Sequence, residues 1–139
     1  GNARRMASGI DQQRLSLLLA VLEKRAGLNL AGDDVFVNIA GGMTVDEPAS
    51  DLGILAAIAS SVRNRVIPST TAVFGEVGLA GEVRGISQAG LRLREATQMG
   101  FRQCVMPEAN VDPSDASQSG PCQFVGVRTV GEALDALLS

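Results

Sequence analysis

Residues 35–62 read VFVNIAGGMTVDEPASDLGILAAIASSV, and they combine a short strand with a long apolar helix. Residues 35–40 include β-branched and aromatic side chains in alternation, which is typical of a strand. Two glycines end the strand, and Pro48 suits the first turn of a helix that we expect over residues 49–64. The predicted buried face of this helix consists of Leu52, Leu55, Ala56, Ala59 and Val62.

Helix and strand patterns alternate in the rest of the chain. Asp11 and Gly27 are suitable caps for a first helix, and residues 129–132 form a capping box for a last one. We expect another helix over residues 87–100 and strands over residues 71–79, 82–84, 104–106 and 124–127. This order predicts an α/β (α+β) domain over residues 10–139, with a mixed sheet covered by helices, preceded by a linker or terminal edge over residues 1–9.

The composition limits the classes of function. The 139 residues have the length of one domain, and the only aromatic residues are four Phe, which argues against a base-stacking surface for single-stranded nucleic acid. A net charge of −3 and a pI of about 4.9 exclude a wholly basic surface. A local basic patch remains open, because eleven of the twelve basic residues are Arg, which binds phosphate or carboxylate in a bidentate manner.

Metal, redox and membrane functions receive no support from the sequence. Cys104 and Cys122 are the only cysteines, and without histidine they cannot form an ordinary four-ligand zinc site. We interpret both as small buried or idle thiols of a reducing compartment. The longest apolar stretch, residues 52–62, is too short to span a bilayer, and no signal peptide is visible, so we expect a cytoplasmic protein without membrane contact.

Residues 46–51, DEPASD, have the layout of a serine protease's nucleophile turn. An acidic-Pro turn leads into a helix N-terminus, where the hydroxyl of Ser50 could lie near free backbone N–H groups. A serine nucleophile needs a base to accept its proton, however. The chain has no histidine, and its only lysine, Lys24, lies far upstream.

Two stretches carry a specific resemblance. DVFVNIAGGMTVDEPASDL at residues 34–52 and GEVGLAGEVRGISQ at residues 75–88 resemble the C-terminal domain of the bacterial RadA (Sms) family of DNA repair proteins. The resemblance continues through ASGID at residues 7–11, LAVLEKR at 19–25, LREA at 93–96 and Gly-Phe at 100–101, and so covers nearly the whole chain. That domain is similar in turn to the proteolytic domain of Lon protease, which implies a ribosomal S5-like α/β fold and assembly into six-membered rings.

The resemblance implies a loss of peptidase chemistry. The Lon active site is a Ser-Lys dyad, with the serine in an Asp-Gly-Pro-Ser-Ala-Gly stretch and the lysine in a Gly-Gly-Leu-Lys stretch. Alignment places Ala49 at the serine position, with Ser50 one residue late, and Gly90 at the lysine position. We therefore expect no catalytic residues, no enzyme activity of this domain, and no metal or cofactor in this chain.

The family's other features are expected outside this sequence. The family has a strand before the first helix, and we expect this chain to begin too late to contain it. No Gly-x-x-x-x-Gly-Lys-Ser/Thr motif is present, so ATP and Mg²⁺ are expected only in the ATPase core of the parent protein, and zinc in its zinc finger. The resemblance implies a parent protein that is a DNA-dependent ATPase or helicase acting beside the RecA recombinase.

The favoured function is an inactive scaffold that forms hexameric rings and guides single-stranded or branched DNA. Four candidate DNA-binding residues lie within nineteen positions that contain one acid: Arg84, Arg92, Arg94 and Arg102. The alternative is that these arginines are solvated and pair with acids or with a neighbouring subunit. Arg63, Arg65, Asp46 and Glu47 are candidates for the subunit interface, although the dipole of the helix over residues 49–64 also explains charges at its two ends. A degenerate peptidase that uses Ser50 and a pure protein-interaction module remain as alternative functions.

Overall fold

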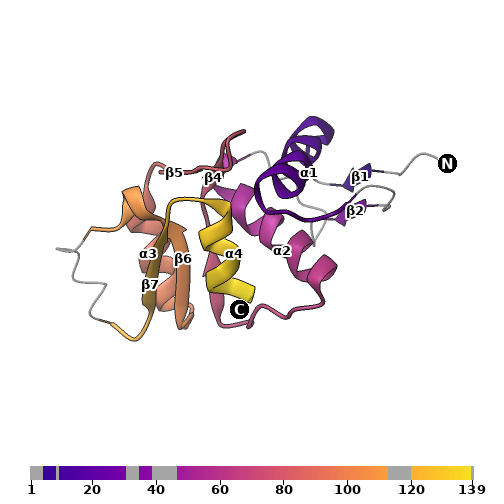
Figure 1. Cartoon of the computed structure of the whole chain (residues 1–139). Coiled ribbons are helices and arrows are strands. Elements are labelled where there is room, and N and C mark those ends of the chain that lie inside the picture. Colours follow the sequence, from indigo (N-terminus) through magenta and orange to yellow (C-terminus); the bar gives the residue numbers. More distant parts are fainter. Residues whose placement is uncertain (1–4, 9, 31–34, 39–46, 113–119, 139) are drawn as a thin grey trace.

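The computed structural model describes residues 5–8, 10–30, 35–38, 47–112 and 120–138. Its helices are α1 (Gln12–Arg25), α2 (Asp51–Arg63), α3 (Ala89–Gln98) and α4 (Val130–Leu138), with short 3-10 turns η2 (Pro48–Ser50) and η3 (Glu108–Asn110). Its strands are β1 (Arg5–Ser8), β2 (Val35–Asn38), β3 (Thr71–Val73), β4 (Glu76–Val77), β5 (Val83–Arg84), β6 (Gln103–Pro107) and β7 (Gln123–Val127). The predicted α/β class is confirmed (Figure 1).

The largest described sheet is parallel and has the strand order β3-β6-β7. The strands β4 and β5 form a separate antiparallel hairpin. That hairpin is connected to the start of α4, because the amide of Val83 donates to the carbonyl of Arg128 at 2.8 Å and that of Val130 to the carbonyl of Gly81 at 2.9 Å. The expected mixture of strand directions is therefore present, but it is divided between a parallel sheet and a hairpin.

The N-terminal residues contradict two predictions. Residues 5–8, expected to be a linker, form β1, and β1 pairs in parallel with β2 in a register that places Met6 opposite Phe36. The prediction that no strand precedes the first helix is therefore wrong. The sequence Arg-Met-Ala-Ser has no clear alternation of apolar residues, and it becomes a strand because β2 offers a backbone edge to it.

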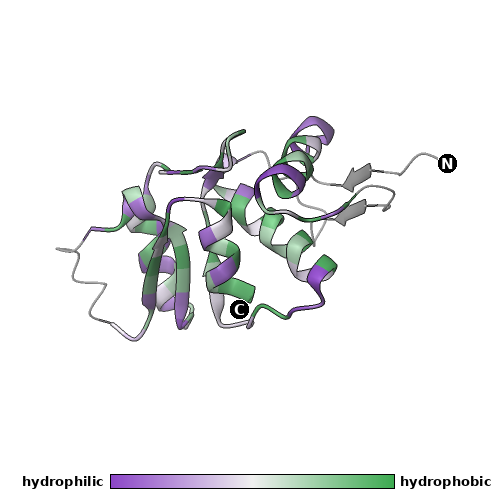
Figure 2. Cartoon of the chain, in the orientation of Figure 1, coloured by the Kyte–Doolittle hydropathy of each residue, from purple (hydrophilic) through white to green (hydrophobic). Residues whose placement is uncertain are grey.

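The sheet β3-β6-β7 separates two hydrophobic clusters. Val105 of β6 belongs to the larger cluster, which α1, α2 and α4 enclose. Its neighbours Cys104 and Met106 point to the opposite face, where they pack with Leu93 of α3. Figure 1 shows α3 and α4 on opposite sides of this sheet, and Figure 2 shows how apolar α2 is along most of its length.

The predicted helix caps of the first and last helices are confirmed. A carboxylate oxygen of Asp11 accepts the amide of Arg14 at 3.2 Å, and Gly27 has a φ of +70° after the end of α1. At α4, the Oγ1 of Thr129 accepts the amide of Glu132 at 3.1 Å. The carboxylate of Glu132 reaches the amide of Arg128 at 2.9 Å, one residue earlier than in a standard capping box.

Three local predictions are wrong. The single strand expected over residues 71–79 is divided into β3 and β4 around Gly75, whose φ is +154°. The helix expected from Ser87 begins at Ala89, after Gln88 in the left-handed region with a φ of 59°. Val62, expected on the buried face of α2, is 41% exposed, because residues 61–64 at the end of the helix are all exposed on every side.

Both cysteines are free and lie in the cluster under α3. Burial raises the pKa of the Cys104 thiol to about 12, and burial also raises the pKa of Cys122. Because the thiolate is the reactive form, both groups are inert in the folded chain at neutral pH. The interpretation of both cysteines as small buried or idle thiols agrees with these positions, since both side chains are fully buried.

We predict that Ellman's reagent at pH 8 labels neither cysteine in the native chain and labels both in urea. The reaction requires exposure and deprotonation, and the folded structure prevents both. Cys104→Ala and Cys122→Ala variants assign any signal to one thiol. Fast labelling of native Cys104 would show that the cluster under α3 is open.

Candidate functional site

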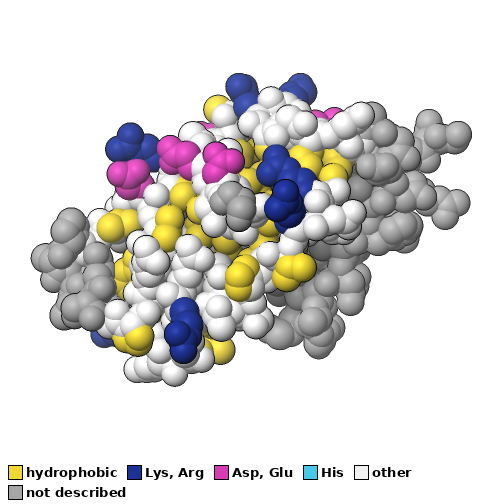
Figure 3. Space-filling model, turned by 60° about the horizontal axis from the view of Figure 1, so that its bottom comes forward, with side chains coloured by type: hydrophobic (Ala, Val, Ile, Leu, Met, Phe, Trp, Pro, Cys, Tyr) yellow, Lys and Arg dark blue, Asp and Glu magenta, His cyan; other side chains and the backbone are white. Residues whose placement is uncertain are grey.

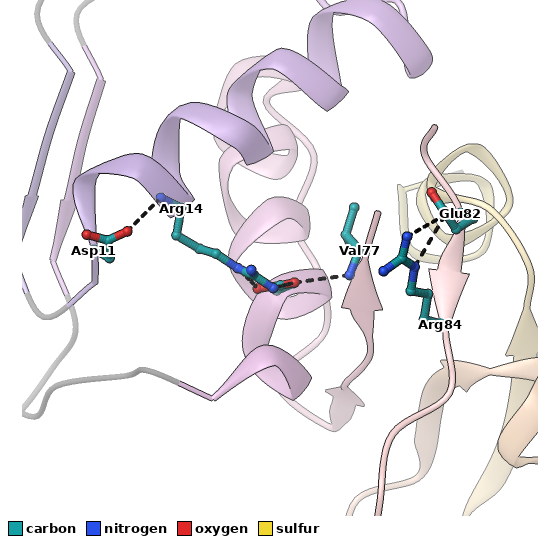
Figure 4. Close-up of polar contacts among 6 residues, drawn as sticks. Asp11, Arg14, Val77, Glu82 and Arg84 are labelled. Atoms are coloured by element: carbon teal, nitrogen blue, oxygen red, sulfur yellow. Dashed lines mark hydrogen bonds and ion pairs between the residues drawn. The ribbon is translucent and has the colours of Figure 1, made fainter. Parts of the chain in front are cut away.

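The N-terminus of α2 contains the one charged side chain that is buried among the described residues, Asp51, which is 2% exposed. The Oδ1 of Asp51 accepts a hydrogen bond from the Nε of Arg14 at 2.7 Å, and its Oδ2 accepts one from the Nη2 of the same guanidinium. The same second oxygen accepts the backbone amide of Val77 at 3.0 Å. Figure 4 shows Arg14 extending from α1 toward Val77 of β4.

These bonds connect α1, α2 and β4 through one carboxylate. The hydrogen bond to Asp51 raises the pKa of Arg14, so the guanidinium remains charged. Both oxygens of Asp51 accept hydrogen bonds from groups of the same chain, and the side chain is buried, so it presents almost no surface to a neighbouring subunit. The helix dipole was the role that the sequence suggested for charges at this end of the helix, and it did not point to Arg14.

The backbone at the start of α2 is hydrogen-bonded to the connection between β3 and β4. The amide of Gly75 donates to the carbonyl of Ala49 at 2.8 Å, and the carbonyl of Gly75 accepts the amide of Leu52 at 3.0 Å. Ala49 itself is 4% exposed. A Cβ atom on Gly75 would lie 3.0 Å from the Cγ1 of Val83, so this close approach requires glycine.

The two residues that the resemblance aligns with the Lon dyad, Ala49 and Gly90, have no reactive group. Ala49 lies in η2, and Gly90 lies in the first turn of α3 with open space around it. Ser50 is half-buried, and its side chain makes no capping hydrogen bond to α2. A hollow of about 240 Å³ next to this helix start is lined by residues that include Ile10, Arg14 and Ile54, but Ser50 is not among its lining residues.

The four arginines predicted to bind DNA have two different environments. Arg92 forms an ion pair with Glu47, and Arg84 forms one with Glu82 at 2.9 Å. Figure 4 shows the second pair on the hairpin. The hydrogen bond from Arg84 lowers the pKa of Glu82. Arg94 and Arg102 are exposed, and neither forms an ion pair within the described residues.

The structure does not gather these four arginines in one patch. Arg92 and Arg94 are two residues apart on α3, so their directions diverge by about 200°. On the face drawn in Figure 3, the Lys and Arg side chains lie in separate groups, and one group adjoins acidic side chains. Any DNA contact by this set would therefore involve only part of it.

The residues predicted for the subunit interface are also separated. Asp46 lies outside the described residues, and Glu47 pairs with Arg92 of the same chain. Arg63 and Arg65 are exposed at the end of α2. A guanidinium nitrogen of Arg63 donates to the carbonyl of Ala26 at 3.4 Å, which places the C-terminal ends of α1 and α2 next to each other.

A second, open hollow of about 330 Å³ lies between the hairpin and β7 and is lined by Val83, Glu108, Ala109, Val127 and Arg128. Arg128 and Glu108 form an exposed ion pair at 2.6 Å on its rim. Across the described part of the chain, no group of His, Cys, Asp and Glu has the arrangement of a metal site. Of the helices described, none has both the length and the apolar character needed to cross a bilayer.

Comparison with known proteins identifies relatives of the whole chain. A family model described as "Subunit ChlI of Mg-chelatase" matches residues 11–110. A protein named DNA repair protein RadA from Halalkalibacterium halodurans is 46% identical over 138 residues, which are 99% of this chain and 30% of that protein. Proteins of the same name are 47% identical in Escherichia coli, over 96% of this chain and 28% of the relative, and 47% identical in Bacillus subtilis, over 96% and 29%.

The chain thus spans about 30% of the length of the curated relatives it matches. The resemblance to the RadA family, which rested on residues 34–52 and 75–88, is confirmed by relatives that share almost half of their aligned residues with this chain.

We predict that Asp51→Ala lowers the free energy of unfolding by about 3 kcal/mol, which is measurable by urea denaturation. This is the lower end of the range for breaking a buried ion pair, because Arg14 is 32% exposed and can regain water. An Arg14→Ala, Asp51→Ala double variant should be no less stable than Asp51→Ala alone, since the two losses share one interaction. Glu108→Ala, which breaks an exposed pair, is the matched control and should have a much smaller effect. Equal effects of Asp51→Ala and Glu108→Ala would contradict a stabilising role for the buried carboxylate.

Proposed function

The chain belongs to the family described as subunit ChlI of Mg-chelatase, and from this premise we propose that it is a catalytically inactive, Lon-like domain of a RadA-type DNA repair protein. In this proposal the domain is a ring-forming scaffold that guides DNA. The relatives are named DNA repair protein RadA and are about three times as long as this chain, so the motor activity belongs to other parts of such a protein.

The observation that supports the inactive role is the start of α2, where the backbone is bonded to the β3–β4 connection. Ala49 stands at the position of the Lon serine, it is buried, and its carbonyl is bonded to Gly75. Ser50 follows one residue later and makes no capping hydrogen bond, and Gly90 at the lysine position has no side chain that could act as a base. Nucleophilic catalysis requires a hydroxyl and a proton acceptor within hydrogen-bond reach, and this arrangement supplies neither at the family position.

The DNA-guiding role follows from the relatives' name and from cations that remain available at the surface. Arg94 and Arg102 are exposed and form no ion pair within the described residues. Contacts of this kind bind the phosphate backbone through charge and do not read bases. The scarcity of aromatic residues supports the same mode, because stacking on bases would need them.

The partners in this proposal follow from the parent protein. Six copies of the domain form a ring, and single-stranded or branched DNA passes along it, beside the RecA recombinase in the cytoplasm. ATP and Mg²⁺ belong to the parent's ATPase core and zinc to its zinc finger, so that this chain itself carries no cofactor. The ring multiplies a modest basic surface, since each copy contributes the same cations around one channel.

We predict that a fluorophosphonate serine probe labels the wild-type chain and the Ser50→Ala variant to the same background level. The reason is the missing base, which leaves the Ser50 hydroxyl a weak nucleophile. In-gel fluorescence measures the labelling, and a denatured sample gives the background. Labelling that is specific to the wild type would support the degenerate peptidase.

We predict that the chain binds a labelled single-stranded oligonucleotide in fluorescence anisotropy at 50 mM salt and binds it more weakly at 200 mM. Counterions are released when the cations bind phosphates, so log K falls with log salt by about 0.7 units of slope for each phosphate contact. Light scattering on the same samples gives the mass, and a hexamer is expected. A monomer without DNA affinity at either salt concentration would leave only the protein-interaction module.

A further inference from the structure

α3 covers the smaller of the two hydrophobic clusters, and this cluster is rich in sulfur and aromatic rings. Both cysteines, Met106 and Phe74 are buried members of it, and Phe101 and Phe124 pack against it. Three of the four Phe residues of the chain therefore lie here. Methionine adapts to irregular packing, and sulfur contacts aromatic rings favourably, which suits a cluster whose covering helix can move.

Few apolar contacts hold α3 in place. Its described buried residues are Leu93 and Ala96, whereas α1 has five buried residues. Leu91 is 46% exposed and Met99 is 75% exposed, so much of the apolar surface of this segment faces solvent. The helix also begins without a side-chain cap, since Gln88 makes no capping hydrogen bond. A helix with little burial and no cap opens more easily than the rest of a fold.

Two polar contacts attach α3 to its surroundings. The amide of Ile86 donates to the Oδ1 of Asn110 at 2.8 Å, and the Nδ2 of Asn110 donates to the carbonyl of Ile86 at 3.0 Å, which attaches the segment before α3 to η3. Arg92 of α3 forms an ion pair with Glu47, which directly precedes η2 and α2. We refer to residues 86–99 as the α3 lid and to these two interactions as the Asn110 contact and the Glu47 contact.

The Glu47 contact leaves one group of Arg92 unsatisfied. The Nε of Arg92 is buried and has no hydrogen-bond partner among the described residues. A buried donor without a partner costs free energy in the closed arrangement. Opening of the α3 lid returns this donor to water, which offsets part of the loss of the ion pair.

The larger cluster does not need α3. Val105 of β6 belongs to that cluster on the other face of the sheet, and β6 remains paired with β3 and β7 whether or not α3 is in place. The thiols of Cys104 and Cys122 are fully buried under the closed lid, and burial raises the pKa of Cys104 to about 12. Both thiols therefore regain solvent contact and ordinary acidity only when the lid opens.

We propose that the α3 lid opens while the larger cluster stays folded, and that the open lid makes Cys104 and Cys122 a site of thiol–disulfide exchange with low-molecular-weight disulfides. The site does not depend on the proposed DNA-guiding function, so either can fail without the other.

The exchange needs no reagent besides the disulfide. A cysteine loses its proton to solvent, and its thiolate attacks one sulfur of the disulfide, so that a new S–S bond forms and the original S–S bond breaks. The other half of the disulfide leaves as a thiolate and takes up a proton. Protein interiors are close-packed, so a cysteine that carries such a group no longer fits under α3 and keeps the lid open.

The first test measures how fast Ellman's reagent labels the native chain at pH 8. The lid is closed most of the time, so no labelling is expected within minutes, and the slow rate over hours is the open fraction multiplied by the rate for an exposed thiol. Asn110→Ala removes both bonds of the Asn110 contact and should raise this rate about tenfold. Glu47→Gln weakens a partly exposed ion pair and should raise it about twofold.

Thr129→Ala is the matched control. It removes the cap of α4, where the Oγ1 of Thr129 accepts the amide of Glu132 at 3.1 Å, and so destabilises the larger cluster without a change at α3. Its labelling rate should equal that of the wild type. Acceleration of Thr129→Ala and Asn110→Ala alike, each in proportion to its loss of stability in urea, would show that the thiols are reached only by global unfolding and would overturn the proposal.

The second test treats the wild-type chain with glutathione disulfide and then digests it briefly with trypsin. Mass spectrometry should find glutathione on Cys104 or Cys122. Trypsin should cut after Arg92 or Arg94 faster than in the untreated chain, while cutting after Arg14 of α1 stays unchanged. Dithiothreitol should reverse both effects, because it reduces the mixed disulfide. No modification over hours, or a modified chain whose α3 resists trypsin as well as the untreated one, would overturn the exchange site.

Discussion

The carboxylate of Asp51 lies where α1, α2 and β4 meet, and the arrangement of these three elements depends on it. Two bonds from Arg14 and one from the amide of Val77 use both of its oxygens. A buried charge of this kind is costly unless its partners are all present, so the three elements are stabilised in one arrangement rather than in several. Next to it, the peptide of Gly75 is bonded to Ala49 and Leu52, which attaches the β3–β4 connection to the same helix start.

This constraint explains why a segment with the layout of a nucleophile turn has a structural role. In a peptidase of the Lon type, the start of α2 would present a side chain to a substrate. In this chain, the same backbone is bonded to the β3–β4 connection, and the carboxylate of Asp51 forms an ion pair with Arg14. Ala49, which the resemblance aligns with the Lon serine, is buried, and its small side chain suits the packing at this helix start.

The local elements were largely predictable, and the features that depend on distant partners were not. Hydrophobic periodicity and capping residues predicted α1, α2 and α4, because the signals lie within each helix, as with Asp11 and Thr129. The strand β1 was missed because its residues carry little pattern of their own and pair with β2, about thirty residues away. The ion pairs of Arg14 and Arg92 were missed for the same reason. Spacing along the chain identified four arginines as a group, but Arg92 and Arg84 have acidic partners that only the fold reveals.

The sheet β3-β6-β7 is a single wall between two cores of unequal size. The larger core is shared by three helices, so its loss amounts to global unfolding. The smaller one depends on α3, whose described buried residues are Leu93 and Ala96. Local stability follows buried apolar contact, so α3 and the thiols beneath it form a separate cooperative unit of lower stability. Such a unit can detach and return while the larger core remains folded, so the backbone amides of α3 should exchange their hydrogens faster than those of α1 and α2.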